Sequence, residues 1–292
     1  MTFLFTLVVT FASLLVVAGF LHLFPKLGRV GRRVSESLCR APGLDVVVFY
    51  FIAAPLVVGP VVGGWLGLLG AIGGQVAAVL VWTFLHELAN RAAVRGPRIV
   101  KTLNGLLGGR WRNHAGLWVT AIVAPGFCLV RLGEIISYIP LTWIIGLPAH
   151  RHRDWVNVSR QKFEGLVGHD LLWCLYCDWM TGVWSLGTEM LRNVESFWCP
   201  IRFASGKKCE NCAIDFPDVQ NGWVEAGGNM TMVADTLNRM YSGGQRSWFG
   251  RRGVQLTVNG KPPASDVAVE APVQTVPAAE PPPPPPGPTP AA

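Results

Sequence analysis

The sequence predicts a mainly α-helical protein, with a polytopic helical membrane domain, a small helical cysteine-rich soluble region and a disordered proline-rich tail. Three observations predict this. Apolar residues crowd into the first half of the 292-residue chain, cysteines cluster in the second half, and proline and alanine dominate the end. One soluble core does not accommodate so uneven a distribution. We expect a transmembrane domain at 1–148, a cysteine-containing soluble domain at 149–262 and the tail at 263–292.

Two long stretches near the N-terminus contain no Asp, Glu, Lys or Arg, namely Thr2–Pro25 and Val46–Leu85. A helix needs about 20 apolar residues to cross the hydrocarbon layer, which is about 30 Å thick. The first stretch therefore fits one helix over 2–24. The second is long enough for two helices, over 46–65 and 67–86. Helices are expected because lipid offers no partner to an unpaired backbone group.

The two predicted helices of the second stretch need a turn between them. Proline and several glycines gather between Gly59 and Gly74, with Pro60 near the start of this range. Both residue types interrupt helices. We expect the chain to reverse direction there.

Basic residues flank these apolar stretches and predict the orientation. They follow the first stretch as Lys26, Arg29, Arg32, Arg33 and Arg40, and the second as Arg91, Arg95, Arg98, Lys101, Arg110 and Arg112. Loops rich in Lys and Arg stay on the cytoplasmic side. The N-terminus is therefore expected outside, on an uncleaved anchor, because the start lacks the basic residues and clear cleavage site of a signal peptide. The chain is predicted to be a multi-pass membrane protein.

A third apolar segment, Ala115–Pro148, is interrupted by Pro125 and Pro140. As one span it would place everything downstream outside. As a short hairpin it would return the chain to the cytoplasm, and the basic residues that follow it favour this second arrangement. We therefore expect the C-terminal half on the cytoplasmic side.

Two charged residues, Arg131 and Glu134, lie within this third segment. They are three residues apart, so on a helix they share a face and neutralise each other. Charges at membrane depth are costly and are candidates for function. One interpretation is a pair tolerated near the lipid headgroups, and the other is an ion or proton path.

Two Cys-x-x-Cys pairs, separated by 31 residues, mark the region after the third segment. Four thiolates suit a tetrahedral zinc ion or a small iron–sulfur cluster. The predicted ligands are Cys174, Cys177, Cys209 and Cys212, with Cys199 and His169 as further candidates. The first pair is expected on a helix within Phe163–Trp198, with a break between Trp179 and Gly187 as an alternative.

Other interpretations of these cysteines remain open. Short zinc modules usually have about 15 to 20 residues between their two pairs, so this spacing is longer than usual. Disulfides would require the region to lie outside the cytoplasm. Thiol exchange of the thioredoxin kind lacks the surrounding strand pattern that such a fold needs.

The net charge of +7 does not indicate a nucleic-acid partner, because the basic residues lie beside apolar segments. The expected partner is the lipid bilayer. The proline-rich tail would adopt extended polyproline geometry and either act as a spacer or dock on an aromatic-lined protein. His22 and His86 are expected near the same membrane boundary and offer a further hypothesis, a haem held between them.

No catalytic constellation is recognisable, so the sequence leaves open whether the chain is an enzyme. The first hypothesis is a membrane-anchored binding or scaffold protein whose cysteine module is closed by a structural metal. The second is a membrane redox enzyme or electron carrier with an iron–sulfur centre on the same cysteines. The third is a transport component that uses Arg131 and Glu134.

Overall fold

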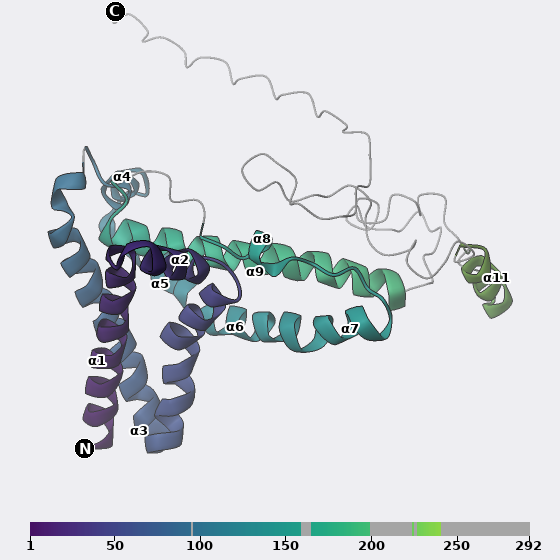
Figure 1. Cartoon of the computed structure of the whole chain (residues 1–292), viewed down its shortest axis with the longest axis horizontal. Helices are drawn as coiled ribbons and strands as arrows, with labels where there is room; N and C mark the ends of the chain where they lie inside the picture. Colours follow the sequence, from purple (N-terminus) through teal and green to yellow (C-terminus); the bar gives the residue numbers. More distant parts are fainter. Residues whose placement is uncertain (95, 159–164, 199–223, 225–226, 241–292) are drawn as a thin grey trace, which may run out of the picture.

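The structure, a computed structural model, describes residues 1–94, 96–158, 165–198, 224 and 227–240, and its described part is mainly α-helical, as predicted (Figure 1). The predicted tail and the cysteines beyond residue 198 lie outside the described residues. The elements are α1 (Thr2–Leu23), η1 (Phe24–Lys26), α2 (Gly28–Leu38), α3 (Gly43–Ala89), η2 (Arg91–Ala93), α4 (Ile99–Leu106), α5 (Arg110–Ala121), α6 (Ala124–Gly133), η3 (Glu134–Tyr138), α7 (Ile139–Ile144), α8 (His152–Trp155), α9 (Gly168–Trp198) and α11 (Met230–Met240).

Helix α3 is a hairpin of two legs rather than one straight helix (Figure 1). The backbone leaves the helical region at Gly63 and Gly64, and Gly64 has φ of 55°. Left-handed backbone of this kind favours glycine, which has no Cβ to clash. The reversal lies within the range where the sequence placed a turn, and the two legs pack with α1 into a three-helix bundle.

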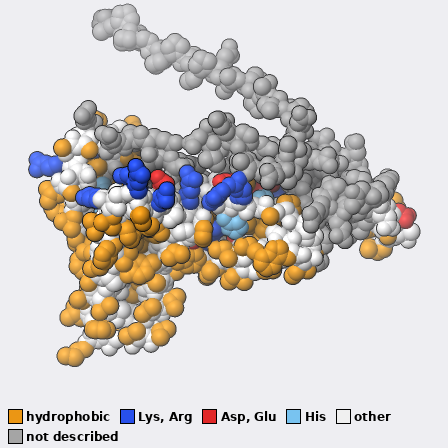
Figure 2. Space-filling view, viewed as in Figure 1, with side chains coloured by type: hydrophobic (Ala, Val, Ile, Leu, Met, Phe, Trp, Pro, Cys, Tyr) orange, Lys and Arg blue, Asp and Glu red, His pale blue; other side chains and the backbone are white. Residues whose placement is uncertain are grey.

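Three helical segments are long and apolar enough to cross a membrane: Thr2–Lys26, Gly43–Ala89 and Arg110–Ile144. The outer surface of the α1–α3 bundle carries exposed apolar side chains along its length, including Val8, Val57 and Phe84. Figure 2 shows this apolar surface below a band of Lys and Arg side chains. The structure therefore supports a multi-pass membrane protein in contact with the bilayer.

Glycines on the second leg of α3 allow α1 to approach closely. A Cβ at Gly74 would lie 2.6 Å from the carbonyl oxygen of Leu7 and 2.8 Å from Cβ of Thr10. The buried residues of α1 recur every fourth position and form one face: Thr6, Thr10, Leu14 and Ala18. Small residues at such a contact are typical of membrane helices, which lack a hydrophobic driving force for association and rely on close packing.

A side chain of the second leg of α3 supplies a hydrogen-bond donor that the first leg lacks. Pro55 has no N–H, so the carbonyl of Phe51 loses its usual helical donor. The amide nitrogen Nε2 of Gln75 donates to this carbonyl at 2.8 Å and to that of Ile52 at 3.0 Å. Because lipid provides no other donor, this polar side chain stabilises an otherwise apolar hairpin.

A second layer, which we call the platform, consists of α6, η3, α7 and α9. Figure 1 shows these helices lying across the axes of the bundle. Its core joins the end of the bundle to α9 through a set of buried residues: Ala41, Leu44, Cys128, Tyr138, Leu147, Val156, Trp179, Val183, Leu186 and Met190.

Helix α9 is continuous from Gly168 to Trp198, so the alternative of a break between Trp179 and Gly187 is wrong. Gly182 instead provides space for a neighbouring segment, because a Cβ there would lie 2.5 Å from the carbonyl oxygen of Trp155. Gly182 is therefore a packing position within a continuous helix.

We expect Gly74→Leu to weaken the bundle. The added side chain has no space against α1 and should lower the free energy of unfolding by about 1–3 kcal/mol. Titration with a denaturing detergent in mixed micelles measures the change. Gly19→Leu is the matched control, because nothing lies within 4 Å of a Cβ at Gly19. Equal losses in both variants would contradict the packing role of Gly74.

Candidate functional site

Three buried charged residues, which we call the charge triad, lie where the platform meets the bundle: Asp45, Arg131 and Glu134. Arg131 holds Asp45 with two hydrogen bonds, Nε to Oδ1 at 3.0 Å and Nη2 to Oδ2 at 2.7 Å. Its Nη1 donates to Oε2 of Glu134 at 2.6 Å. The side chains are 1%, 6% and 4% exposed for Arg131, Asp45 and Glu134. The guanidinium therefore bridges two carboxylates within the protein.

The triad joins three helical elements. Asp45 lies in the first turn of α3, where a carboxylate also interacts favourably with the helix dipole. Arg131 is in α6, and Glu134 begins the π-helical turn η3. Nε1 of Trp179, in α9, lies 3.4 Å from Oδ1 of Asp45. The cluster thus fixes the platform to the start of α3.

The sequence predicted the pairing of Arg131 with Glu134, and the 2.6 Å ion pair confirms that they share a face. It did not predict the third member. Asp45 stands immediately before the long uncharged stretch, so a lone acid at the start of a predicted span was the available signal. Charged side chains within membrane segments usually pair with one another, so this signal would have indicated Arg131 as the partner of Asp45.

The triad contains two carboxyl groups and one guanidinium, so it has one more acidic than basic group. Oε1 of Glu134 is buried and makes no hydrogen bond within the described part of the chain. It faces α9 at Gly187, where a Cβ would lie 2.9 Å from it. Larger side chains at that position would press directly on the carboxylate. The geometry makes the triad a tightly enclosed structural contact rather than an open path.

A second polar cluster lies further along the platform. Tyr138 donates its hydroxyl to the carbonyl of Pro148 at 2.9 Å and accepts from Nδ2 of Asn193, also at 2.9 Å. The same Nδ2 lies 3.0 Å from Nε2 of His150, which accepts when the imidazole is neutral. Burial lowers the pKa of His150 to about 4, which favours this neutral form. The cluster ties the chain after α7 to α9.

The start of α9 is attached to the other end of α3. The backbone N–H of Gly168 donates to Nδ1 of His86 at 3.0 Å. The carboxylate of Asp170 accepts from the backbone N–H groups of Ile99 and Val100, at 3.1 and 3.2 Å. These are the first N–H groups of α4, which have no partner within the helix. Asp170 therefore holds α4 beside α9.

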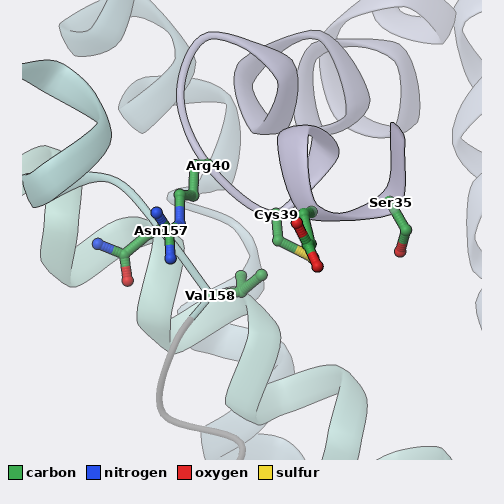
Figure 3. Close-up of a pocket in the computed structure, with 6 residues that line it drawn as sticks. Ser35, Cys39, Arg40, Asn157 and Val158 are labelled. Carbon is green, nitrogen blue, oxygen red and sulfur yellow. The ribbon is translucent and has the colours of Figure 1, made fainter. Parts of the chain in front are cut away.

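A shallow pocket of about 180 Å³ lies between the end of α2 and the chain after α8 (Figure 3). Two backbone hydrogen bonds close it, from Ala41 to the carbonyl of Val156 at 2.9 Å and from Val158 to that of Cys39 at 3.0 Å. Its lining residues are Ser35, Glu36, Cys39, Arg40, Asn157 and Val158. This mixture of one thiol with groups of both charge signs favours no single class of ligand.

The structure places the first predicted cysteine pair on α9, with Cys174 half-buried and Cys177 exposed. Cys199, Cys209 and Cys212 lie outside the described residues. Within the described ranges, no group of three or more His, Cys, Asp or Glu side chains could hold a metal. The four-cysteine site, and with it the zinc ion or iron–sulfur cluster, stays a prediction.

The candidate ligand His169 has one of its two ring nitrogens hydrogen-bonded within α9. Its Nε2 accepts from Nε1 of Trp173 at 3.0 Å, and its Nδ1 lies 3.8 Å from Asp170. Nε2 is therefore engaged on the same helix, whereas Nδ1 is buried and makes no hydrogen bond within the described part of the chain. His169 therefore stays a candidate ligand that the described residues do not test.

The geometry gives no support to a haem between His22 and His86. Their rings contact each other, with centroids 5.2 Å apart, which leaves no space for a macrocycle between them. Nε2 of His22 accepts from Nε1 of Trp82 at 3.2 Å, while Nδ1 of His86 is bonded to α9. These histidines join α1, α3 and α9.

Comparison with models of protein families, with curated proteins and with solved structures finds no match for this chain. The function is therefore inferred from its own residues and geometry.

We expect Arg131→Met to destabilise the fold by about 3–5 kcal/mol, because it leaves two buried carboxylates without their counter-charge. Titration with a denaturing detergent measures the loss. Arg153→Met is the control, since the side chain of Arg153 is 57% exposed and its ion pair with Asp154 is long, at 4.0 Å. Combining Arg131→Met with Asp45→Asn and Glu134→Gln should recover much of the loss, because no buried charge then remains. Equal effects of Arg131→Met and Arg153→Met would contradict the role of the triad.

We expect stability to fall as the pH drops below 6.5, because His150 titrates with a pKa of about 4 in the folded chain and near its ordinary value of 6.5 when unfolded. The neutral form is favoured by folding, so this stability is present above pH 6.5 and is lost as the pH falls towards 4. His150→Gln retains a hydrogen-bond acceptor without titrating. Between pH 7 and pH 5 the variant should lose about 1–2 kcal/mol less than the native chain. Parallel pH profiles would contradict this assignment.

Proposed function

We propose that this chain is a membrane-anchored binding or scaffold protein that holds its cysteine-bearing segment at the bilayer surface. The observation that carries the proposal is the charge triad. It locks α6 and η3 to the membrane bundle through one buried guanidinium and the carboxylate of Asp45, and Trp179 of α9 contacts the same carboxylate. A rigid attachment of this kind suits a protein whose role is to position the segment beyond α9.

The side on which the segment is held is inferred from charge. Helix α2 places exposed Arg29, Arg32 and Arg33 on one face and the exposed Val30 and Val34 on another. An amphipathic helix with this pattern lies in the headgroup region of a membrane. Figure 2 shows basic side chains in one band above the apolar bundle. By the positive-inside rule this side is cytoplasmic and the N-terminus lies outside.

The segment itself is proposed to bind a metal through the two cysteine pairs. Cys174 and Cys177 are three residues apart on α9, so they project from neighbouring positions on one side of a rigid helix. Cys209 and Cys212 would complete the set of four thiolates around zinc, or around an iron–sulfur cluster in the redox alternative. The proline-rich tail beyond this module would serve as a spacer or as a site for an aromatic-lined protein partner.

The transport alternative receives less support from the geometry. It requires Arg131 and Glu134 to meet a mobile ion or proton. Both are buried, and Arg131 is held from two directions by carboxylates. A guanidinium satisfied in this way is better suited to a permanent contact than to a conduction path.

We expect the full chain, purified in detergent, to contain about one zinc ion per molecule and to be colourless. Elemental analysis and the visible spectrum measure both properties. Cys209→Ser or Cys212→Ser should abolish the bound zinc, because either change removes one of four ligands.

Cys39→Ser is the matched control, because Cys39 lines the pocket near α2 and lies outside both Cys-x-x-Cys pairs. Its zinc content should equal that of the native chain. Iron and visible absorption would favour the redox alternative. Absence of any metal from the native chain would refute metal binding while leaving the anchoring role to be judged by resistance to alkaline extraction of the membranes.

A further inference from the structure

The direction of α9 is set by contacts at both ends of the α3 hairpin. Asp45 lies at the start of α3 and His86 near its end, but the hairpin brings both to the same end of the bundle. Helix α9 contacts His86 through Gly168, at 3.0 Å, and Asp45 through Trp179, at 3.4 Å. Eleven helical residues separate the two contacts, about 16 Å along the helix. α9 therefore runs across the end of the bundle and does not continue its axes.

The segment α6–η3–α7 runs beside α9 in the same direction. Tyr176 donates to the carbonyl of Thr120 at 2.8 Å, just before α6. Further along, Gly187 faces Glu134, and Asn193 donates to Tyr138 at 2.9 Å. Residue numbers rise together on both helices, so the two run parallel over this length. Figure 1 shows them side by side and crossing the bundle axes.

The side of α6–η3–α7 that faces away from α9 is apolar and exposed. Leu129 is 70% exposed, Ile136 67% and Trp143 79%. The opposite side carries the buried Cys128, Arg131 and Tyr138. Figure 2 shows apolar side chains continuing from the bundle onto the platform below the same basic band. This continuity makes the face part of one surface with the lipid-facing bundle.

We propose that α6–η3–α7 does not cross the membrane but lies in the plane of the leaflet on the basic side, with its apolar face against the acyl chains. The proposal rests on the membrane anchoring proposed above. Its length and composition suit a span, but its attachment to Asp45 fixes it at the depth where α3 begins. The triad is then shielded at the headgroup boundary, a less costly depth than the bilayer centre.

The in-plane arrangement has a consequence for topology. The bundle crosses the bilayer three times, once with α1 and twice with the legs of α3. Without a fourth crossing, α9 and the segment after it stay on the side of α2 and α4. The start of α1 lies on the opposite side.

The test measures depth directly in the full chain. A fluorescent non-natural amino acid is placed singly at Leu129, Ile136 or Trp143, and the protein is reconstituted into vesicles whose lipids carry bromine at defined acyl positions. All three sites should be quenched most strongly by the same shallow bromine position. A crossing segment would instead be quenched at different depths, with Ile136, near its middle, deeper than Trp143 near its end, and would overturn the proposal. Val8 and Phe20 in α1 serve as controls, because both are exposed and should differ in depth.

The controls separate this proposal from the anchoring role. Quenching at Val8 without any at the three platform sites would mean that a protein covers the apolar face, and would overturn the in-plane arrangement alone. Absence of quenching at Val8 and Phe20 as well would refute membrane anchoring itself. Protease treatment of sealed vesicles gives a second measurement: tags at the two ends of the chain should be cleaved from opposite sides, and cleavage from one side would overturn the proposal.

Discussion

The buried guanidinium of Arg131 is the contact on which the arrangement of the molecule depends. A buried arginine needs a counter-charge, because the free energy of removing its charge from water is far larger than the free energy gained by packing its side chain. Asp45 and Glu134 meet this requirement from two different elements. Once the bidentate bond to Asp45 forms, α6 is fixed in position, depth and rotation relative to α3. The core around Trp179 and Leu186 then packs α9 onto this frame.

The α1–α3 bundle is stabilised by other interactions than the platform. Its outer surface faces lipid, so burying further apolar area contributes little to the association of the helices. Close packing and hydrogen bonds between helices contribute more. Gly70 and Gly74 let α1 approach within contact of the hairpin. Gln75 supplies the donor that Pro55 lacks. The platform is instead held by charge and by aromatic packing, which are effective where the protein itself encloses the groups.

Periodicity and charge gaps predicted much of the helical bundle. The uncharged stretches indicated helices, the glycines indicated the reversal found at Gly63 and Gly64, and the spacing of Arg131 and Glu134 indicated their pair. The direction of the segment α6–η3–α7 relative to the bundle was not predictable in this way. The composition of an apolar helix is the same whether it crosses a bilayer or lies within one leaflet, and the proposed in-plane arrangement rests on tertiary contacts such as the long-range bond to Asp45, 86 residues away in the chain.

The histidines show a second limit of sequence patterns. His22 and His86 lie at the same end of the bundle, as the sequence predicted, but spacing along the chain carries no information on the distance between two rings. Their contact, and the bond from Gly168 to His86, arise from the packing of three helices. The spacing of the two cysteine pairs likewise carries no information on the distance between them in the folded chain.

The tightness of the α3 hairpin makes the molecule one-sided. The reversal takes place within Gly63 and Gly64, so the two legs are joined by almost no loop. The side chains that flank this turn are exposed and apolar, with Val62 56% and Trp65 72% exposed. Among the described residues, the arginines of α2, the shallow pocket and the start of α9 are gathered at the opposite end of the bundle. In the proposed membrane arrangement, the two ends of the bundle therefore differ in kind: one end carries apolar side chains around a tight turn, and the other carries basic side chains and the attached helix α9.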